Sequence, residues 1–308
     1  MIKSGGMEAA KGRGADIFIP FLTNQKGNII MKSKFLNSLI LAALAIPGVA
    51  MAADVETAEH KEGKHVIPET AHHTITSNVG LFSNYLYRGI SQTGGKPAIQ
   101  GGFDYARTGG FYAGVWGSSI SWLTDSPAVT GATSAQVELD IYLGFKNSFA
   151  TDLSYDIGFL RYNYPASYTA TLPSGAAKAD TNEIYGALSY SIVTAKYSYS
   201  LGDTFGISDA KGTSYVELNV SYPIPDAGVT LGAHYGKQTY KGSSTDALVA
   251  ASSTPTYADY KLSVSKDFSG YAVGLAYSST NANKVQYTSG TNKYLGKNVA
   301  VLSLARSF

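Results

Sequence analysis

One stretch, residues 135–147, limits the folds open to this chain more than any other. Its sequence, AQVELDIYLGFKN, alternates apolar and polar residues without a break. Side chains on an extended strand alternate between two faces, so one face would carry Val137, Leu139, Ile141, Leu143 and Phe145. The opposite face would carry Gln136, Glu138, Asp140, Tyr142, Gly144 and Lys146. A helix would scatter these residues around its circumference, so we expect a strand with one apolar and one charged face.

Twelve runs of this kind follow one another along the chain. We expect strands at residues 74–88, 98–107, 111–121, 135–147, 153–164, 182–192, 194–202, 213–223, 229–240, 257–268, 271–279 and 298–308. The first run puts Tyr85 and Tyr87 on its apolar face and Arg88 on its polar face. The fifth run loses its alternation towards the end, which suggests a bulge. In the third run the pattern does not decide which way Trp116 points.

The connections between these runs alternate in length. Those after the odd-numbered runs are long, whereas those after the even-numbered runs are short, at residues 108–110, 148–152, 193, 224–228 and 269–270. A soluble sandwich gives no reason for this separation, although it too would bury an apolar strand face. Short periplasmic turns, long external loops and tilted strands of about ten residues are typical of a transmembrane barrel. The predicted fold is all-β, a transmembrane antiparallel up-and-down β-barrel of about 12 strands, over residues 74–308.

The segment before the barrel resembles an export signal. Met31 begins a basic start, an apolar run follows, and Ala50-Met51-Ala52 is a small-residue cleavage site, so residues 31–52 are predicted to be a signal peptide. The mature chain would then begin at Ala53, with residues 53–73 as a flexible periplasmic segment. Residues 1–30 lack this pattern. We interpret them as an upstream extension from a misassigned start, the alternative being a long genuine leader.

Composition excludes several classes of function. The chain has no cysteine, which excludes disulfides, cysteine-ligated metals and thiol chemistry. Of 24 Lys/Arg and 22 Asp/Glu, residues 1–52 hold six and two, which leaves 18 bases and 20 acids in the mature chain. That balance offers no basic patch for nucleic acid. No motif for a cofactor and no complete metal-ligand spacing is present, so we expect neither.

Charged residues on the polar strand faces are the candidate functional residues. They are Arg88, Asp104, Glu138, Asp140, Lys146, Asp156, Glu183, Lys196, Glu217, His234 and Lys261. Charged side chains that line a pore set its ion selectivity. The same side chains could instead pair across the lumen and only neutralise one another, because unpaired buried charge is costly. Both interpretations remain open at this point.

A lipid hydrolase embedded in the barrel is a weaker alternative. A serine nucleophile needs a histidine to activate it. His234 is the only histidine within the barrel runs, and the alternation directs it to the lumen, away from lipid. The chain also has no Gly-x-Ser-x-Gly elbow between a strand and a helix. We therefore do not expect an enzyme, and a closed barrel that serves as an anchor or adhesin remains the main competitor to a pore.

The last residue suggests how the protein reaches its membrane. Phe308 ends the final run on the same face as Leu302 and Leu304, which predicts a signal for the outer-membrane assembly machinery. Arg306 departs from the usual apolar pattern there, but its stem can lie along lipid while its head reaches water.

Several motifs resemble those of the TorF family, whose members are classed as porins by their expected function. They are Ser83-Asn84-Tyr85-Leu86-Tyr87-Arg88-Gly89-Ile90-Ser91-Gln92-Thr93, Gly114-Val115-Trp116-Gly117-Ser118, Glu138-Leu139-Asp140-Ile141-Tyr142, Asn182-Glu183-Ile184-Tyr185-Gly186 and Ser307-Phe308. The resemblance covers nearly all of residues 74–308. It implies a barrel in the outer membrane of Gram-negative bacteria, surrounded by lipid and lipopolysaccharide, with no catalytic residues to carry over.

A barrel of this size predicts a modest channel. Twelve strands make a barrel wider than the eight-stranded kind that side chains fill, and narrower than general porins. We expect passive diffusion of small hydrophilic solutes or ions. A weak preference for cations would follow from the excess of acids, with Glu138 and Asp140 two residues apart on one face.

Overall fold

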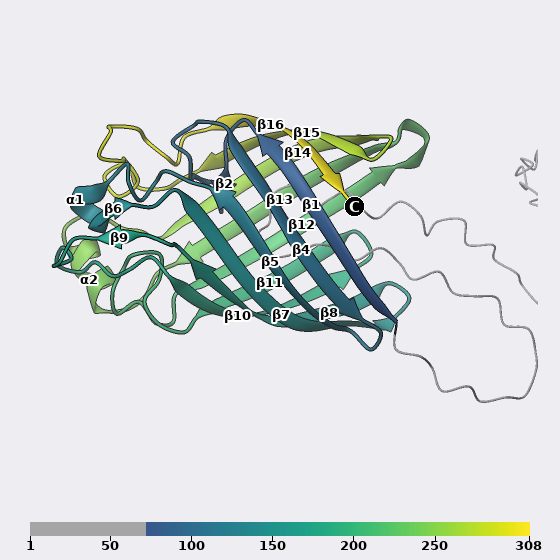
Figure 1. Cartoon of the computed structure of the whole chain (residues 1–308), viewed down its shortest axis with the longest axis horizontal. Helices are drawn as coiled ribbons and strands as arrows, with labels where there is room; N and C mark the ends of the chain where they lie inside the picture. Colours follow the sequence, from purple (N-terminus) through teal and green to yellow (C-terminus); the bar gives the residue numbers. More distant parts are fainter. Residues whose placement is uncertain (1–71) are drawn as a thin grey trace, which may run out of the picture. The chain divides into compact units, whose positions relative to one another are not determined.

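The computed structural model describes residues 72–308. The predicted signal peptide, the expected cleavage between Ala52 and Ala53, and residues 53–71 of the N-terminal segment lie outside the described residues. Within them, twelve strands form one closed antiparallel barrel, seen along its side in Figure 1. The expected fold class is confirmed.

Each barrel strand pairs with its neighbours in chain order, and β1 closes the barrel by pairing with both β4 and β16. The barrel strands are β1 (His73–Phe82), β4 (Ala98–Arg107), β5 (Phe111–Ser119), β7 (Val137–Ala150), β8 (Leu153–Asn163), β10 (Thr181–Tyr190), β11 (Val193–Ser200), β12 (Ser214–Ile224), β13 (Val229–Thr239), β14 (Tyr257–Phe268), β15 (Tyr271–Thr280) and β16 (Val299–Ser307). Every expected strand is present, with ends that shift by a few residues.

The two ends of the barrel differ as the connection lengths predict. In Figure 1 the long connections gather at the left end, whereas the tight turns and the C-terminus lie at the right. The smaller elements are β2 (Leu86–Tyr87), β3 (Ile90–Ser91), α1 (Pro127–Thr130), β6 (Ala132–Ser134), β9 (Ser167–Tyr168), the 3-10 turn η1 (Pro225–Ala227) and α2 (Ser243–Ala250). Among residues 72–308, no helix is long and apolar enough to cross a membrane.

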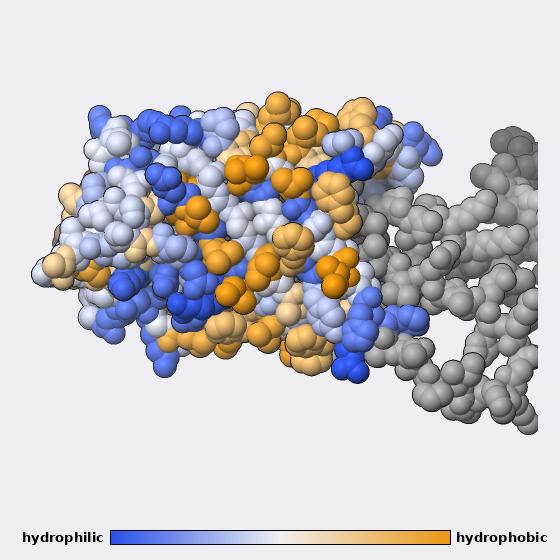
Figure 2. All heavy atoms as spheres, viewed as in Figure 1, coloured by the Kyte–Doolittle hydropathy of each residue, from blue (hydrophilic) through white to orange (hydrophobic). Residues whose placement is uncertain are grey.

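The barrel is apolar outside and polar inside. Along β7, Leu139, Ile141 and Leu143 are 40–46% exposed, whereas Glu138 and Asp140 between them are 1% and 0% exposed. Figure 2 shows the resulting apolar side chains across the middle of the visible face, with hydrophilic residues towards the ends. A water-soluble protein has the opposite arrangement. A closed barrel leaves no unpaired sheet edge, so this is the architecture of a transmembrane β-barrel.

Two local predictions are wrong. The first strand ends at Phe82 rather than at Arg88, because Ser83 and Asn84 turn the chain, and Tyr85 is 4% exposed instead of facing outwards. The expected bulge in the fifth run is also absent from the part of the chain that the structure describes. The pairing of β8 with β10 is continuous from Leu153 to Tyr162, and its inward residues simply become large and apolar.

Trp116, whose direction the pattern left open, faces inwards. It lies opposite Asp140 in the pairing of β5 with β7, and directly opposed residues of an antiparallel pair share one face. Its ring packs edge-on against the ring of Tyr85, with centroids 5.7 Å apart.

Candidate functional site inside the barrel

The first long connection, loop 1 (residues 83–97), folds into the barrel. Its short strands β2 and β3 form a hairpin whose tip is Arg88-Gly89. Gly89 has a φ of +76°, and a Cβ atom added there would lie 2.6 Å from Thr280 Cγ2 and 2.7 Å from Asp259 Cβ. Only glycine fits so close a contact. The tip of loop 1 therefore presses against the inner face of β14 and β15.

Arg88 extends from this tip to side chains on β10 and β13. Its guanidinium donates two hydrogen bonds to the Glu183 carboxylate on β10, at 3.1 and 2.7 Å, and one to Gln238 Oε1 on β13, at 2.6 Å. It also lies over the Tyr215 ring, 4.3 Å from the centroid. The side chains of Arg88 and Glu183 are only 7% and 2% exposed. Arg88 does face the lumen, as predicted, but from a loop and not from a strand.

Glu183 is the centre of this group of contacts. In addition to Arg88, Tyr162 donates to its Oε2 at 3.2 Å and Ser200 donates to its Oε1 at 3.4 Å. Tyr87 of loop 1 donates to the Tyr162 hydroxyl at 2.7 Å. Loop 1 is thus held across the barrel by a charged, bidentate pair with neutral hydrogen bonds around it, the strongest kind of polar contact available to it.

A second polar group surrounds His234. Its Nε2 lies 2.9 Å from Asp259 Oδ1 and its Nδ1 lies 2.7 Å from Asn219 Oδ1, while Glu217 Oε2 is 3.7 Å from Nδ1. Tyr215 donates to Asp259 Oδ2 at 2.9 Å. Both ring nitrogens of His234 are therefore engaged, and no serine of the described chain is among their partners.

A third group lies nearer the turn end of the barrel and mixes acids, lysines and tyrosines. Tyr112 donates to Asp156 at 2.6 Å and also contacts the Tyr185 hydroxyl, while Tyr142 donates to Asp104. The Lys196 ammonium lies 4.2 Å from the Tyr185 ring centroid, and the Lys146 ammonium lies 5.6 Å from that of Tyr112. These predicted pore residues therefore contact aromatic partners that the sequence analysis did not select.

The remaining predicted residues have fewer partners. Lys261 lies opposite His234 in the pairing of β13 with β14. Glu138 accepts one hydrogen bond, from the Tyr164 hydroxyl at 3.2 Å, through its Oε1. Glu138 Oε2 and both oxygens of Asp140 are buried and accept no hydrogen bond from any described residue. Within residues 72–308, no group of three or more His, Cys, Asp or Glu side chains is arranged to hold a metal ion.

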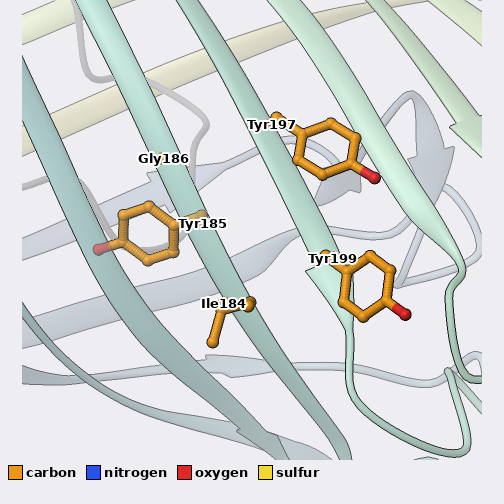
Figure 3. Close-up of a pocket in the computed structure, with 5 residues that line it drawn as sticks. All are labelled: Ile184, Tyr185, Gly186, Tyr197 and Tyr199. Carbon is orange, nitrogen blue, oxygen red and sulfur yellow. The ribbon is translucent and has the colours of Figure 1, made fainter.

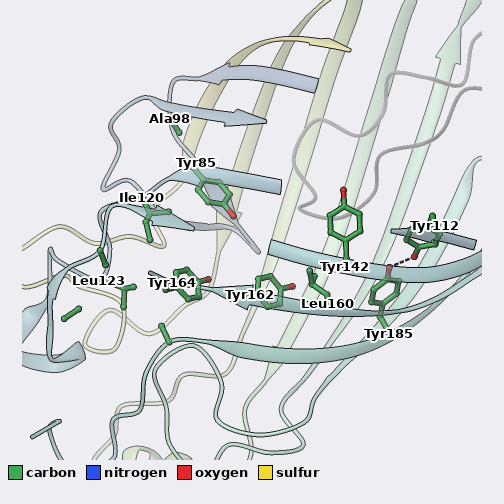
Figure 4. Packing of buried hydrophobic residues seen from close by; sticks show 13 residues of the cluster. Tyr85, Ala98, Tyr112, Ile120, Leu123, Tyr142, Leu160, Tyr162, Tyr164 and Tyr185 are labelled. Atoms are coloured by element: carbon green, nitrogen blue, oxygen red, sulfur yellow. Dashed lines mark hydrogen bonds between the residues drawn. The ribbon is translucent and has the colours of Figure 1, made fainter. Parts of the chain in front are cut away.

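Two parts of the inner wall differ in side-chain size. The tyrosine wall is the inner face of β5, β7, β8 and β10, where large side chains pack together as Figure 4 shows: Tyr112, Tyr142, Leu160, Tyr162 and Tyr185. The small-residue wall is the inner face of β15 and β16, where Val301 is accompanied by smaller residues between exposed apolar ones: Ala272, Gly274, Ala276, Ser278, Ser303 and Ala305. The small-residue wall therefore lacks the large side chains that characterise the tyrosine wall and the His234 group on β12 to β14.

Sequence reasoning missed several residues of this interior, for different reasons. Asp259 and Gln238 follow the same alternation as Lys261 and His234, so the parity of β14 and β13 could have found them. Tyr85 and Tyr87 were placed outside because the first strand was extended too far. The turn-forming pair Ser83-Asn84 was the available signal.

A shallow depression of about 410 Å³ lies on the outer face between β10 and β11 (Figure 3). It forms over Gly186, which has no side chain to fill it, and Ile184, Tyr197 and Tyr199 surround it. Because its lining is mainly apolar and it lies outside the barrel, it does not belong to a path for hydrophilic solutes.

The C-terminal residue joins the barrel seam. Phe308 exchanges backbone hydrogen bonds with Ser77 of β1, at 2.8 and 3.1 Å, and its side chain is 67% exposed. The Arg306 guanidinium lies over the Tyr271 and Phe308 rings, 4.5 and 5.1 Å from their centroids. This aromatic contact lets a charged residue sit on the apolar face.

Comparison with known proteins assigns the chain to a family. It belongs to the Gcw_chp family, described as bacterial protein of unknown function, whose model matches residues 68–308. The family model is not named TorF, so the expected TorF membership stays a prediction. No curated protein matches the chain.

Solved structures similar to the chain include OprD, an outer membrane protein. OprD of Pseudomonas aeruginosa has 14% identity and a TM-score of 0.33, covering 76% of this chain and 66% of its own. OccAB3 of Acinetobacter baumannii has 11% identity and a TM-score of 0.38, covering 74% and 59%. OccD3 (OpdP) of P. aeruginosa has 12% identity and a TM-score of 0.36, covering 78% and 65%. The chain thus spans less than two thirds of each of these proteins, and the barrel assignment rests on its own strand pairing.

Proposed function

We propose that the protein is a porin-like channel of the outer membrane that admits small hydrophilic solutes or ions by passive diffusion. The observation that carries this proposal is the distribution of polarity across the barrel wall. The outer face is apolar, while acids, lysines and a histidine are directed inwards, where they serve a solvated path better than a packed core. The predicted pore residues, Arg88 included, would line that path.

Conductance tests this proposal directly. Refolded protein added to a planar lipid bilayer should produce discrete, stepwise increases in current. Folding can be checked independently, because folded barrels migrate differently on a gel before and after heating. Folded protein that inserts but produces no current steps would contradict a channel.

A closed barrel that acts as an anchor or adhesin is the second candidate, and one observation favours it. Loop 1 crosses the lumen and is held by Arg88, Glu183 and Gln238, so it occupies part of the opening. An anchor would leave the bilayer current unchanged, so the same recording separates the two candidates. Neither candidate is an enzyme, and neither requires a cofactor.

Delivery to the outer membrane belongs to the same proposal. We expect the assembly machinery to recognise the final strand, and lipid with lipopolysaccharide to surround the apolar face. N-terminal sequencing of the membrane protein should read from Ala53. Deletion of Phe308 should lower the yield of heat-modifiable barrel, because it removes both the terminal aromatic side chain and two backbone hydrogen bonds to β1. Normal yield would contradict its role as an assembly signal.

A further inference from the structure

Six of the seven buried side-chain atoms without a hydrogen-bond partner in residues 72–308 belong to five residues at the loop end of the tyrosine wall. These residues are Asn84, Tyr85, Trp122, Glu138 and Asp140. Three of the six atoms are carboxylate oxygens, and Glu138 and Asp140 are 1% and 0% exposed. A buried carboxylate without partners is among the most costly arrangements in a protein. Such a pair calls for a positive charge between or beside the two groups.

Four of these six atoms are oxygens and two are the side-chain N–H groups of Asn84 and Trp122, so the group contains no cation. Glu138 and Asp140 are neighbours on the inner face of β7, about 6–7 Å apart along the strand. Tyr164 already donates to Glu138 Oε1 at 3.2 Å. Arg88 of loop 1 is committed to Glu183 and Gln238. The two acids therefore carry up to two negative charges that no described residue neutralises by an ion pair.

Two loop tyrosines face the same space. Tyr164 reaches Glu138 through the hydrogen bond to Oε1. The Tyr85 ring packs against Trp116, which lies directly opposite Asp140 in the pairing of β5 with β7. Tyr85 is only 4% exposed, and its hydroxyl has no hydrogen-bond partner among the described residues. Figure 4 shows Tyr85, Tyr162 and Tyr164 near one another.

We propose that Glu138, Asp140 and the Tyr85 hydroxyl form a binding site for a hard divalent cation of the Ca²⁺ class at the loop end of the lumen. The donors are all oxygen atoms, which hard cations prefer, and two carboxylates match a double positive charge. Ca²⁺ tolerates irregular geometry and completes its shell with water, so two protein acids suffice. Any role of this site in permeation rests on the proposed channel function, whereas binding of the cation does not.

Terbium luminescence tests the site without any need for conduction. Tb³⁺ occupies Ca²⁺ sites, and nearby tyrosines sensitise its emission, so folded protein in detergent should give sensitised emission that Ca²⁺ displaces. The double substitution Glu138→Gln/Asp140→Asn should weaken Tb³⁺ binding by at least about tenfold, and Tyr85→Phe by a smaller factor. The matched control, Glu217→Gln/Asp259→Asn, removes the same two charges beside His234 and should bind Tb³⁺ like the wild type.

Each result decides the proposal. Displaceable emission that the first double substitution removes and the control keeps would support the site. If folded wild-type protein gives no displaceable emission, or if both double variants lose the emission equally, the proposed site is overturned. If the first variant does not fold, Ca²⁺ displacement in wild type together with weaker binding by Tyr85→Phe supports the site, and unchanged binding by Tyr85→Phe overturns it. A protein that conducts but binds no Tb³⁺ would refute the site and leave the channel intact.

Discussion

The two walls of the barrel interior obey one strand pattern but contain very different side chains. On the tyrosine wall, Tyr112, Tyr142, Tyr162 and Tyr185 fill the space beside β5 to β10, and the first three donate hydrogen bonds to acids. On the small-residue wall, mostly alanine, glycine and serine alternate with outward apolar residues. Alternation along each strand therefore decides which residues point inwards. The volume of those side chains decides how much of the cross-section of the lumen stays open. We expect the solute path to run between the small-residue wall on one side and the charged side chains held by the tyrosine wall on the other.

The largest effect should come from the contact by which loop 1 is attached to the tyrosine wall. Arg88→Ala would leave Glu183 buried without its cation and should lower the free energy of unfolding by about 3–5 kcal/mol. Arg161→Ala is the matched control, because Arg161 pairs with Asp180 at 3.3 Å but both side chains are partly exposed, at 40% and 35%. Its cost should be about 0–1 kcal/mol. Denaturant unfolding of refolded protein measures both, and equal losses would refute the structural role of the Arg88 contact.

A bulky residue on the small-residue wall should reduce conduction. Ala276 faces inwards opposite Val301, so Ala276→Tyr should lower single-channel conductance by roughly twofold or more. Ala300 lies on the outer face opposite Tyr277, and Ala300→Tyr makes the same change towards lipid. The control should conduct like wild type. Unchanged conductance in both variants would place the solute path elsewhere.

Selectivity should depend on the acids at the loop end of the tyrosine wall. Glu138→Gln/Asp140→Asn removes negative charge from the lumen, so the reversal potential in a salt gradient should shift towards anions. The shift should be largest at low salt, where screening is weakest. Glu217→Gln/Asp259→Asn should shift it less, because those carboxylates already contact His234. If the Glu138→Gln/Asp140→Asn protein conducts with an unchanged reversal potential, then Glu138 and Asp140 have a purely structural role.

The smallest effect should come from a single tyrosine hydroxyl. Tyr142→Phe removes the hydrogen bond to Asp104 and should cost about 1–2 kcal/mol of unfolding free energy. Tyr277→Phe removes a hydroxyl from the outer face, where Tyr277 is 53% exposed, and should change stability by less than about 0.5 kcal/mol. Unfolding curves that coincide for the two variants would show that the hydroxyls of the tyrosine wall add no rigidity.

The sequence by itself determined the barrel strands and the direction of most of their side chains. Both depend on a period of two, which is a local property of extended chain, and on the lengths of the connections. That is why Glu138, Asp140, Glu217 and His234 could be assigned to the inner face from their positions alone. Local pattern failed at Ser83-Asn84, where apolar tyrosines continue past the end of β1 and imitate a longer strand.

Only the tertiary structure decided which of these side chains meet. Arg88 and Glu183 are 95 residues apart in sequence, and Tyr112 and Tyr185 are 73 apart, so neither contact leaves a trace in local spacing. Closure of the sheet and the register of each pair bring them across the lumen, and the inward fold of loop 1 adds Arg88 to Glu183. The same closure leaves Asp140 buried beside Glu138 with no described partner, because its neighbours in space come from strands and loops whose placement depends on the whole barrel.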